Sequence, residues 1–435
     1  MGAPAPSNFK MSQSVELSKR FSFINQQLVT FDEVLCWFDW DFQPDDPMVV
    51  DISKCTQADY QALSLLVLYI WKIRAAGATV NLHTEGSGLQ SAWTMFKTMG
   101  AVGWPQVLIS ERENFKHSQY KPLVALRNSD DFNRVKERLD QFSLDFQLEY
   151  AKILHYVTAE ILYNTLEHGQ CWVKDRDGKD FRIPSIVQLS WYKKTNMISV
   201  IVADMGIGIR KHLSRAYPDV ESDADALRLA IRPNVSGTFG RTNPYTQQNN
   251  AGVGLFFSSQ IMQKLRGDMY VISGNGLLHI SPRDITARTL KCTWPGTIVY
   301  LKIDLRKTDS AFKLDLMLAE TRKVAAEELR SRQSAAKEES FYLSIYNYFG
   351  RFAENKMEAI SYKDKYLLPA AESGKTIILD FMDVEMSTHS FLSALLKGPI
   401  GAFVAAGLNP YKKIKMRNPN ADIRETVEYI LESLT

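Results

Sequence analysis

The sequence contains few cysteines and no closely spaced pair of them. Its 435 residues include four, which are Cys36, Cys55, Cys171 and Cys292. None belongs to a Cys-x-x-Cys pair, so their spacing argues against a zinc site or a disulfide framework. This cysteine usage predicts a reducing compartment, and we expect a cytoplasmic protein.

The sequence also lacks an excess of charge of either sign. Lysine and arginine number 52 against 49 aspartate and glutamate residues, which gives a net charge of +3. Such a balance does not attract nucleic acid or an anionic membrane strongly. The aromatic residues between positions 31 and 42 lack accompanying basic residues, so we expect them in a core or a contact between domains. The composition therefore predicts neither a nucleic-acid partner nor a membrane partner.

No apolar run is long enough to span a bilayer. The most apolar stretch, residues 62–71, meets Lys72 too soon, and residues 1–8 lack the features of a signal peptide. Hydrophobic residues nevertheless make up 45% of the chain. A chain of this length is expected to form roughly two to four domains.

The two ends of the chain have similar patterns. Near the start, residues 48–52 read as a buried strand, residues 60–76 as a helix that ends at Gly77, and residues 79–83 as a second strand. This order predicts a β-loop-α-β unit with its helix packed on a sheet.

The corresponding pattern near the C-terminus starts with a strand at residues 376–381. A polar turn is expected at residues 386–390, followed by an apolar helix over 391–406 that Gly407 closes. A longer α/β region, about residues 130–305, separates the two patterns.

Two further segments differ in composition from their surroundings. Residues 309–339 have apolar residues at helical spacing that give way to charged ones, which predicts a connecting helix. Residues 236–250 are rich in glycine, threonine, asparagine and glutamine, which predicts a mobile loop. Its place just before Gly252 suggests a lid.

Glu160 and Asn164 are four residues apart in a predicted helix, so both point from one helical face. Mg²⁺ prefers a few hard oxygen ligands together with waters and nucleotide phosphates. We therefore predict Asn164 as a metal ligand and Glu160 as a general base. The alternative is that both are ordinary solvent-facing helix residues.

Asp204 follows the apolar strand 198–203 and leads into Gly206-Ile-Gly208. A buried carboxylate at this position can accept a hydrogen bond from the exocyclic amine of adenine, while glycines let the backbone approach a purine. The alternative is a tight turn that needs aspartate and glycine for conformational reasons only.

Gly252 and Gly254 precede the apolar helix 255–265. Backbone N–H groups and the positive end of that helix dipole can face phosphates, although such a glycine pair also serves as a simple helix start. Further on, Gly296 and Thr297 open an alternating strand, where the threonine hydroxyl can contact the base directly or through water.

In order, these motifs resemble the N, G1, G2 and GT boxes of the Bergerat-fold (GHKL) ATPases, which include gyrase, MutL and the histidine kinases. Asn-Thr-Leu-Glu-His-Gly at 164–169 looks most like the anti-sigma-factor serine kinases. The resemblance implies an α/β sandwich, an α+β fold in which a mixed sheet backs ATP under helices and a lid. It implies that Asn164 holds Mg²⁺, that Glu160 activates the attacking hydroxyl or water, that Asp204 fixes adenine, and that glycines shape the pocket; these are Gly206, Gly208, Gly252 and Gly254.

The C-terminal pattern is similar to the STAS-like domains related to anti-sigma-factor antagonists. In these domains a strand ending in aspartate, here Asp380, precedes a loop with serine or threonine and then a helix. The resemblance makes Ser387, Thr388 and Ser390 candidate phosphoacceptors, while helix capping is the alternative role for at least one of them. Residues 48–56 are similar to the same type of domain but lack the usual acceptor serine followed by glycine.

Together these interpretations predict four parts. They are a STAS-like N-terminal domain at 1–125, a Bergerat-fold domain at 126–305, a linker helix at 306–339 and a STAS-like C-terminal domain at 340–435.

The predicted function is a regulatory protein that binds ATP with Mg²⁺ and either hydrolyses it or transfers its γ-phosphate to a protein serine or threonine. Closure of the lid would be signalled to the STAS-like domains and read by a protein partner. The alternatives are an ATPase that works as a homodimeric clamp and a nucleotide-gated scaffold without turnover.

Overall fold

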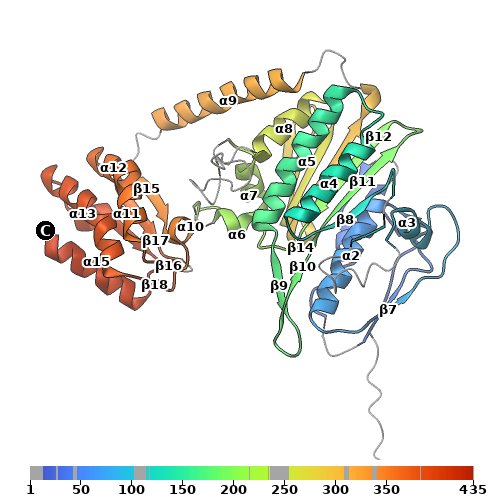
Figure 1. The fold of residues 1–435 in the computed structure, drawn as a ribbon, viewed down its shortest axis with the longest axis horizontal. Coiled ribbons are helices and arrows are strands. Elements are labelled where there is room, and N and C mark those ends of the chain that lie inside the picture. Colours follow the sequence, from blue (N-terminus) through green and yellow to red (C-terminus); the bar gives the residue numbers. More distant parts are fainter. Residues whose placement is uncertain are drawn as a thin grey trace, which may run out of the picture. The chain divides into compact units, whose positions relative to one another are not determined.

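The computed structural model describes residues 13–25, 28–42, 47–101, 114–116, 118–214, 216–233, 235, 254–307, 313–335, 340–382 and 384–434. The chain forms two compact units (Figure 1). The first comprises Met1–Arg210, Ser222–Leu229 and Phe257–Leu318, and the second comprises the rest. Within the described ranges, every helix is too short or too polar to cross a membrane.

A five-stranded sheet with the order β13-β14-β12-β11-β8 forms the centre of the first unit. Its strands are β8 (Leu123–Leu126), β11 (Ser185–Tyr192), β12 (Met197–Ala203), β13 (Asp268–Ile280) and β14 (Ile285–Asp304). Every neighbouring pair is antiparallel. The expectation of a mixed sheet was therefore wrong, because short turns join β11 to β12 and β13 to β14, and such turns produce antiparallel pairs.

Helices cover both faces of this sheet. The helices α4 (Ser129–Phe142) and α5 (Leu148–His168) lie side by side on one face (Figure 1). The other face packs against α2 (Tyr60–Ala75), which shares one hydrophobic core with Ile201 and Ala203 of β12. Consequently β12 is buried at every position after Met197, as expected for a strand covered on both sides.

The N-terminal residues form a small parallel sheet with the order β1-β5-β7. Its strands are β1 (Gln13–Glu16), β5 (Met48–Asp51) and β7 (Val80–His83), and α2 connects the last two. This confirms the strand, helix and strand predicted for this part. The carboxylate of Asp59 begins α2 by accepting a hydrogen bond from the Ala62 N–H, at 2.7 Å.

The other elements between residues 20 and 335 are short, apart from α8 and α9. They are β2 (Arg20–Phe21), β3 (Ile24–Asn25), β4 (Leu28–Val29), α1 (Asp32–Leu35), β6 (Gln57–Ala58), α3 (Ala92–Thr98), β9 (Cys171–Lys174), β10 (Asp180–Ile183), α6 (Ile209–Leu213), α7 (Asp223–Ala230), α8 (Gly254–Lys264), the 3₁₀ helix Leu305–Lys307 and α9 (Leu314–Ala335). The helices predicted over 255–265 and within 309–339 are both present as α8 and α9.

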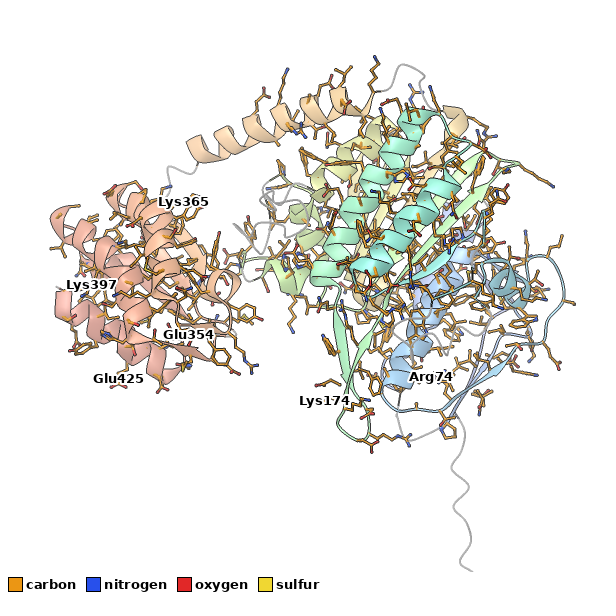
Figure 2. All side chains as sticks on the ribbon, in the orientation of Figure 1. Arg74, Lys174, Glu354, Lys365, Lys397 and Glu425 are labelled. Atoms are coloured by element: carbon orange, nitrogen blue, oxygen red, sulfur yellow. A yellow bond between two sulfur atoms is a disulfide. The ribbon has the colours of Figure 1, made fainter. Side chains whose placement is uncertain are left out.

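A second sheet, parallel and with the order β15-β17-β19, lies in the C-terminal part. Its strands are β15 (Ser340–Ser344), β17 (Thr376–Asp380) and β19 (Ile414–Arg417). It shares a core with α13 (His389–Ala405) and α15 (Ala421–Leu434), while charged side chains such as Lys397 and Glu425 lie on the outside (Figure 2).

Among the shorter elements of this part, one differs from the prediction. They are α10 (Ile345–Phe349), β16 (Phe352–Ala353), α11 (Lys356–Tyr362), the π-helix Lys363–Leu367, α12 (Leu368–Glu372), β18 (Met386–Ser387) and α14 (Pro410–Lys413). The turn predicted at 386–390 begins with strand β18, which pairs with β16. A pairing with a segment more than 30 positions earlier in the chain leaves no local signal.

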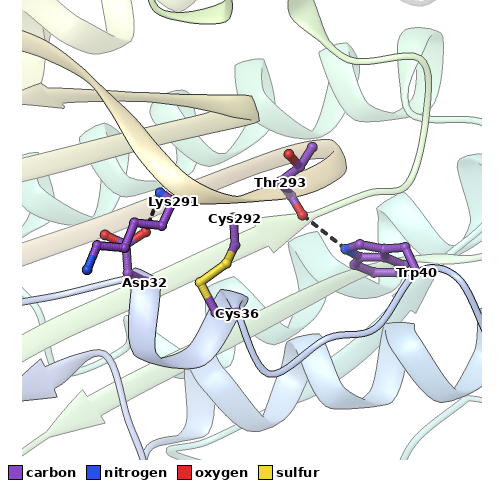
Figure 3. Close-up of a disulfide and its surroundings, with 6 residues drawn as sticks. All are labelled: Asp32, Cys36, Trp40, Lys291, Cys292 and Thr293. Atoms are coloured by element: carbon purple, nitrogen blue, oxygen red, sulfur yellow. Dashed lines mark hydrogen bonds between the residues drawn. A yellow bond between two sulfur atoms is a disulfide. The ribbon is translucent and has the colours of Figure 1, made fainter.

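A disulfide bond joins Cys36 to Cys292 (Figure 3). Their Cα atoms are 5.1 Å apart although 256 positions separate them in the sequence. The expectation that the cysteines would not pair was therefore wrong, because packing of α1 against β14 brings them together. Cys55 and Cys171 are free thiols.

Candidate functional site

Asp204 lies directly after β12, and only 5% of it is exposed. Its Oδ1 accepts hydrogen bonds from the backbone N–H groups of Gly206, at 2.9 Å, and Thr297, at 3.1 Å. Among the residues that the structure describes, none donates a hydrogen bond to Oδ2. One oxygen of the carboxylate is thus fixed by the protein, and the other can accept from a ligand.

Glycines surround Asp204 so closely that a side chain would not fit. A Cβ atom on Gly296 would lie 2.3 Å from the Asp204 carbonyl oxygen, and one on Gly206 would lie 2.4 Å from the carbonyl oxygen of His168. A Cβ on Gly169 would lie 2.8 Å from Asp204 itself. The absence of these side chains lets the last turn of α5 lie directly against the loop that carries Asp204.

Gly208 is required for its backbone conformation as well as for space. Its φ angle is +76°, in the left-handed region that glycine tolerates best, and a Cβ there would lie 2.9 Å from Ser273 Oγ. The Ser273 hydroxyl accepts from the Ile209 N–H at 2.8 Å and donates to the Gly296 carbonyl at 3.0 Å. Ser273 therefore ties the Gly206-Ile-Gly208 loop to Gly296. The prediction that Gly296 and Thr297 open a strand was wrong, because β14 pairs with β13 from Ile285 onward and both residues lie inside it.

Trp294 supports Asp204 from the other side. It is fully buried, and its indole Nε1–H donates a hydrogen bond of 2.8 Å to the Asp204 carbonyl oxygen. Trp294, Ser273 and Gly169 were not predicted from the sequence. Gly169 directly follows a predicted helix, and a glycine at that position indicates the end of a helix. Its φ of −83° does not require glycine, so the reason for glycine is the close approach of Asp204.

Burial raises the pKa of the Asp204 carboxyl to about 6, while the hydrogen bonds from Gly206 and Thr297 oppose the rise. The group is therefore ionised near neutral pH. An ionised carboxylate accepts hydrogen bonds only, which suits recognition of an amino group.

Glu160 and Asn164 lie on α5, whose last turn contacts the Asp204 loop. Glu160 is half-buried; burial raises its pKa, and a hydrogen bond from Tyr156 opposes this effect. A carboxylate with a raised pKa is suited to accept a proton near neutral pH. Asn164 is exposed, so its side chain is accessible to a ligand.

The predicted phosphate side of the site can be placed only in part. Gly254 begins α8, as the sequence suggested. Gly252 and the predicted lid at 236–250 lie outside the described residues.

The donor set fits magnesium only together with a nucleotide. In the described part of the chain, no three histidine, cysteine, aspartate or glutamate side chains come together as a metal site. Asn164 supplies a single neutral oxygen, so a Mg²⁺ ion held there would take most of its ligands from waters and phosphates.

The three candidate phosphoacceptors near β18 have different surroundings. The Ser387 hydroxyl donates to the Ala353 carbonyl at 3.0 Å. Thr388 caps α13, since its Oγ1 accepts from the Phe391 N–H at 3.2 Å. Ser390 is exposed, and its hydroxyl lies 3.2 Å from that of Thr388. Ser390 is therefore the most accessible of the three.

Comparison with known protein families identifies one part of the chain. A family described as a STAS-like domain of unknown function (DUF4325) matches residues 362–424, which run from the end of α11 to the first turn of α15. No Bergerat-fold family matched, and no curated protein matched the chain. The molecule is thus a mixed α/β protein with several small sheets that carries a STAS-like domain in its C-terminal part.

Proposed function

We propose that the first unit binds ATP with Mg²⁺ and that the protein is a nucleotide-dependent regulator. The observation that carries this proposal is the surroundings of Asp204. One carboxylate oxygen is held by two backbone N–H groups, and glycines exclude side chains around it. In this proposal, the second oxygen accepts a hydrogen bond from the amino group of adenine.

A purely structural turn explains the burial of this carboxylate less well. Its pKa of about 6, against 3.8 for an ordinary aspartate, corresponds to roughly 3 kcal/mol that the folded state loses when the group ionises. An exposed aspartate would form the same turn without that loss. Ionisable groups whose pKa is strongly shifted by burial concentrate at functional sites.

The catalytic part of the proposal assigns roles to α5. Asn164 contributes an oxygen to Mg²⁺, and Glu160 accepts the proton of the hydroxyl group or water that attacks the γ-phosphate. A serine hydroxyl as the attacking group gives a protein kinase, with Ser390 as a candidate acceptor, and water gives an ATPase.

Calorimetry with a non-hydrolysable ATP analogue tests binding. We expect binding that strengthens with Mg²⁺, and we expect Asn164→Ala to remove the effect of Mg²⁺ because it removes the proposed ligand. An absence of heat at millimolar analogue with magnesium present would refute the proposal.

Incubation with γ-labelled ATP separates the three modes of action. Label on the protein supports a kinase, and free labelled phosphate supports an ATPase. Binding without either product supports a scaffold that responds to nucleotide without turnover.

A further inference from the structure

The disulfide bond is one of three links between the N-terminal segment and a single short stretch of β14 (Figure 3). The Lys291 N–H donates to Asp32 Oδ1 at 2.8 Å, and Trp40 Nε1–H donates to the Thr293 carbonyl at 3.0 Å. Cys292, which lies between these two residues, is bonded to Cys36. Three consecutive residues of β14 are thus fastened to residues 32–40.

The same segment packs against the residue that supports Asp204. The ring of Trp40 meets the ring of Trp294 edge-on, with centroids 5.3 Å apart, and Phe38 does the same at 5.6 Å. Trp294 in turn donates its indole hydrogen bond to the Asp204 carbonyl. Trp40 contacts Trp294, and Trp294 contacts Asp204, the residue proposed to bind adenine. Trp40 itself lies four residues after Cys36.

The bridge is also the cysteine pair that a reagent in solution reaches most easily. Cys36 is exposed and Cys292 is half-exposed. Cys55 is buried, which raises its pKa to about 11, and burial also raises the pKa of Cys171. Thiol–disulfide exchange needs an accessible sulfur and a thiolate, so the Cys36–Cys292 bond is the favoured point of exchange.

We propose that the Cys36–Cys292 bond regulates nucleotide affinity by holding Trp40 and Phe38 against Trp294. This inference rests on the proposed function of the Asp204 site. In the reaction, two small-molecule thiols reduce the bond. The protein sulfur–sulfur bond breaks, each cysteine sulfur gains one electron and one proton, and the two small thiols become one disulfide.

In the reduced protein, residues 32–40 lose their covalent link to β14. Their hydrogen bonds, ring contacts and the buried side chains of Val34 and Leu35 remain. Opening of this segment removes the packing of Trp40 and Phe38 on Trp294, and the hydrogen bond from Trp294 to Asp204 is then less firmly positioned. The carboxylate loses preorganisation, and nucleotide binds more weakly.

A disulfide that only stabilises the fold makes a different prediction. Such a bond changes the free energy of unfolding but leaves the affinity of the folded protein unchanged. Nucleotide affinity below the unfolding temperature is therefore the deciding measurement.

The experiment compares the oxidised protein, the protein reduced with dithiothreitol, and the double variant Cys36→Ser/Cys292→Ser. Calorimetry with Mg²⁺ and a non-hydrolysable ATP analogue should give an affinity about fivefold or more higher for the oxidised form. The double variant should match the reduced protein and should not respond to dithiothreitol. Alkylation and mass measurement verify which cysteines are bonded.

A second variant tests the contact between Trp40 and Trp294 without changing a cysteine. Trp40→Ala keeps the disulfide but removes the contact with Trp294, so the oxidised variant should bind as weakly as the reduced wild type. Trp172→Ala is the matched control, because Trp172 is 59% exposed on β9 and should leave affinity unchanged. Circular dichroism confirms that each variant is folded.

Linkage supplies an independent readout. If the bond strengthens nucleotide binding, nucleotide must favour the bond by the same factor. The ratio of disulfide to dithiol in glutathione buffers should therefore rise with saturating analogue by the factor seen in calorimetry.

The outcomes separate this inference from the proposed function. Equal affinity of the oxidised and reduced proteins, or cysteines that stay unpaired in oxidised glutathione, would overturn the redox inference alone. If no form of the protein binds the analogue, the proposed nucleotide site itself is wrong.

Discussion

At the scale of single residues, Asp204 combines two properties that usually exclude each other. It is buried, and it is ionised near neutral pH. Its position after an apolar strand and before two glycines was predictable from the sequence. The residues that support it were not, because Trp294 and Ser273 come from β14 and β13, and no local pattern links them to position 204.

The first prediction concerns Asp204→Asn. The amide oxygen can still accept from the N–H groups of Gly206 and Thr297. The amide nitrogen replaces the second oxygen, and it donates hydrogen bonds, so it cannot accept one from the amino group of the ligand. We expect nucleotide affinity to fall about 10- to 100-fold, measured by calorimetry. Asp177→Asn, in the exposed β9–β10 turn, is the control and should bind normally.

The pH dependence of stability gives a second check on Asp204. Since its folded-state pKa is raised to about 6, its ionisation costs stability as the pH rises from about 4 to 6. The free energy of unfolding of Asp204→Asn should therefore not fall below that of the wild type at pH 7.5. A strongly destabilised variant would show that the carboxylate serves the fold instead.

Glu160→Gln tests the proposed base. We expect turnover of ATP to fall about 100-fold or more, because the amide cannot accept the proton, while analogue affinity is retained. Since burial raises the pKa of Glu160, wild-type turnover should increase with pH as this group ionises. Glu137→Gln, on the exposed side of α4, is the control. Undiminished hydrolysis by Glu160→Gln would remove this residue from the mechanism.

At the scale of elements, the strongly patterned segments were predictable. The strands β5, β12 and β17 and the helices α2, α5 and α13 follow apolar spacing that local sequence determines. Strand β18 was not predicted, since its partner β16 lies more than 30 positions earlier. The antiparallel order of the central sheet was not predicted either, because the expectation of a mixed sheet came from the family resemblance and not from the short turns between neighbouring strands.

The junction of β12 and β14 is expected to be sensitive to added volume. In Gly296→Ala the new Cβ would lie 2.3 Å from the Asp204 carbonyl oxygen, so β14 and the loop that follows β12 must move apart. We expect a loss of about 1 to 3 kcal/mol in the free energy of unfolding by chemical denaturation. Gly401→Ala, where α13 has open space, should be neutral or slightly stabilising. Equal effects of both substitutions would contradict the packing described here.

The start of α13 separates a capping residue from a candidate acceptor. Thr388→Ala removes the hydrogen bond to the Phe391 N–H and should cost about 1 kcal/mol of stability. Ser390→Ala should leave the melting temperature unchanged. If the protein phosphorylates itself at this loop, mass spectrometry should find the phosphate on Ser390, and label that persists in Ser390→Ala would place the acceptor elsewhere.

At the scale of the whole molecule, the sequence predicted several cores and a STAS-like C-terminal part. It did not predict that α2 and the central sheet share one core, or that a disulfide bridges 256 positions. Composition and periodicity report local structure, whereas such contacts depend on how distant segments pack. The predicted boundaries after residues 125, 305 and 339 remain predictions.

Reduction should destabilise the first unit. The bond closes a very long loop, so its loss increases the entropy of the unfolded chain and should lower the free energy of unfolding by about 2 to 4 kcal/mol. Urea denaturation with and without dithiothreitol measures this difference. Cys36→Ser/Cys292→Ser should unfold at the lower urea concentration in both conditions, and a wild-type midpoint that ignores dithiothreitol would contradict the expectation.

The burial of α2 has a consequence for synthesis in the cell. This helix leaves the ribosome well before β10, β11 and β12, against which it packs, have been translated. Until β12 emerges, part of the apolar surface of residues 60–75 lacks its partner and is prone to aggregate. The nascent chain should therefore depend on chaperones until translation passes residue 203, and a ribosome-bound intermediate stalled before that point should bind them.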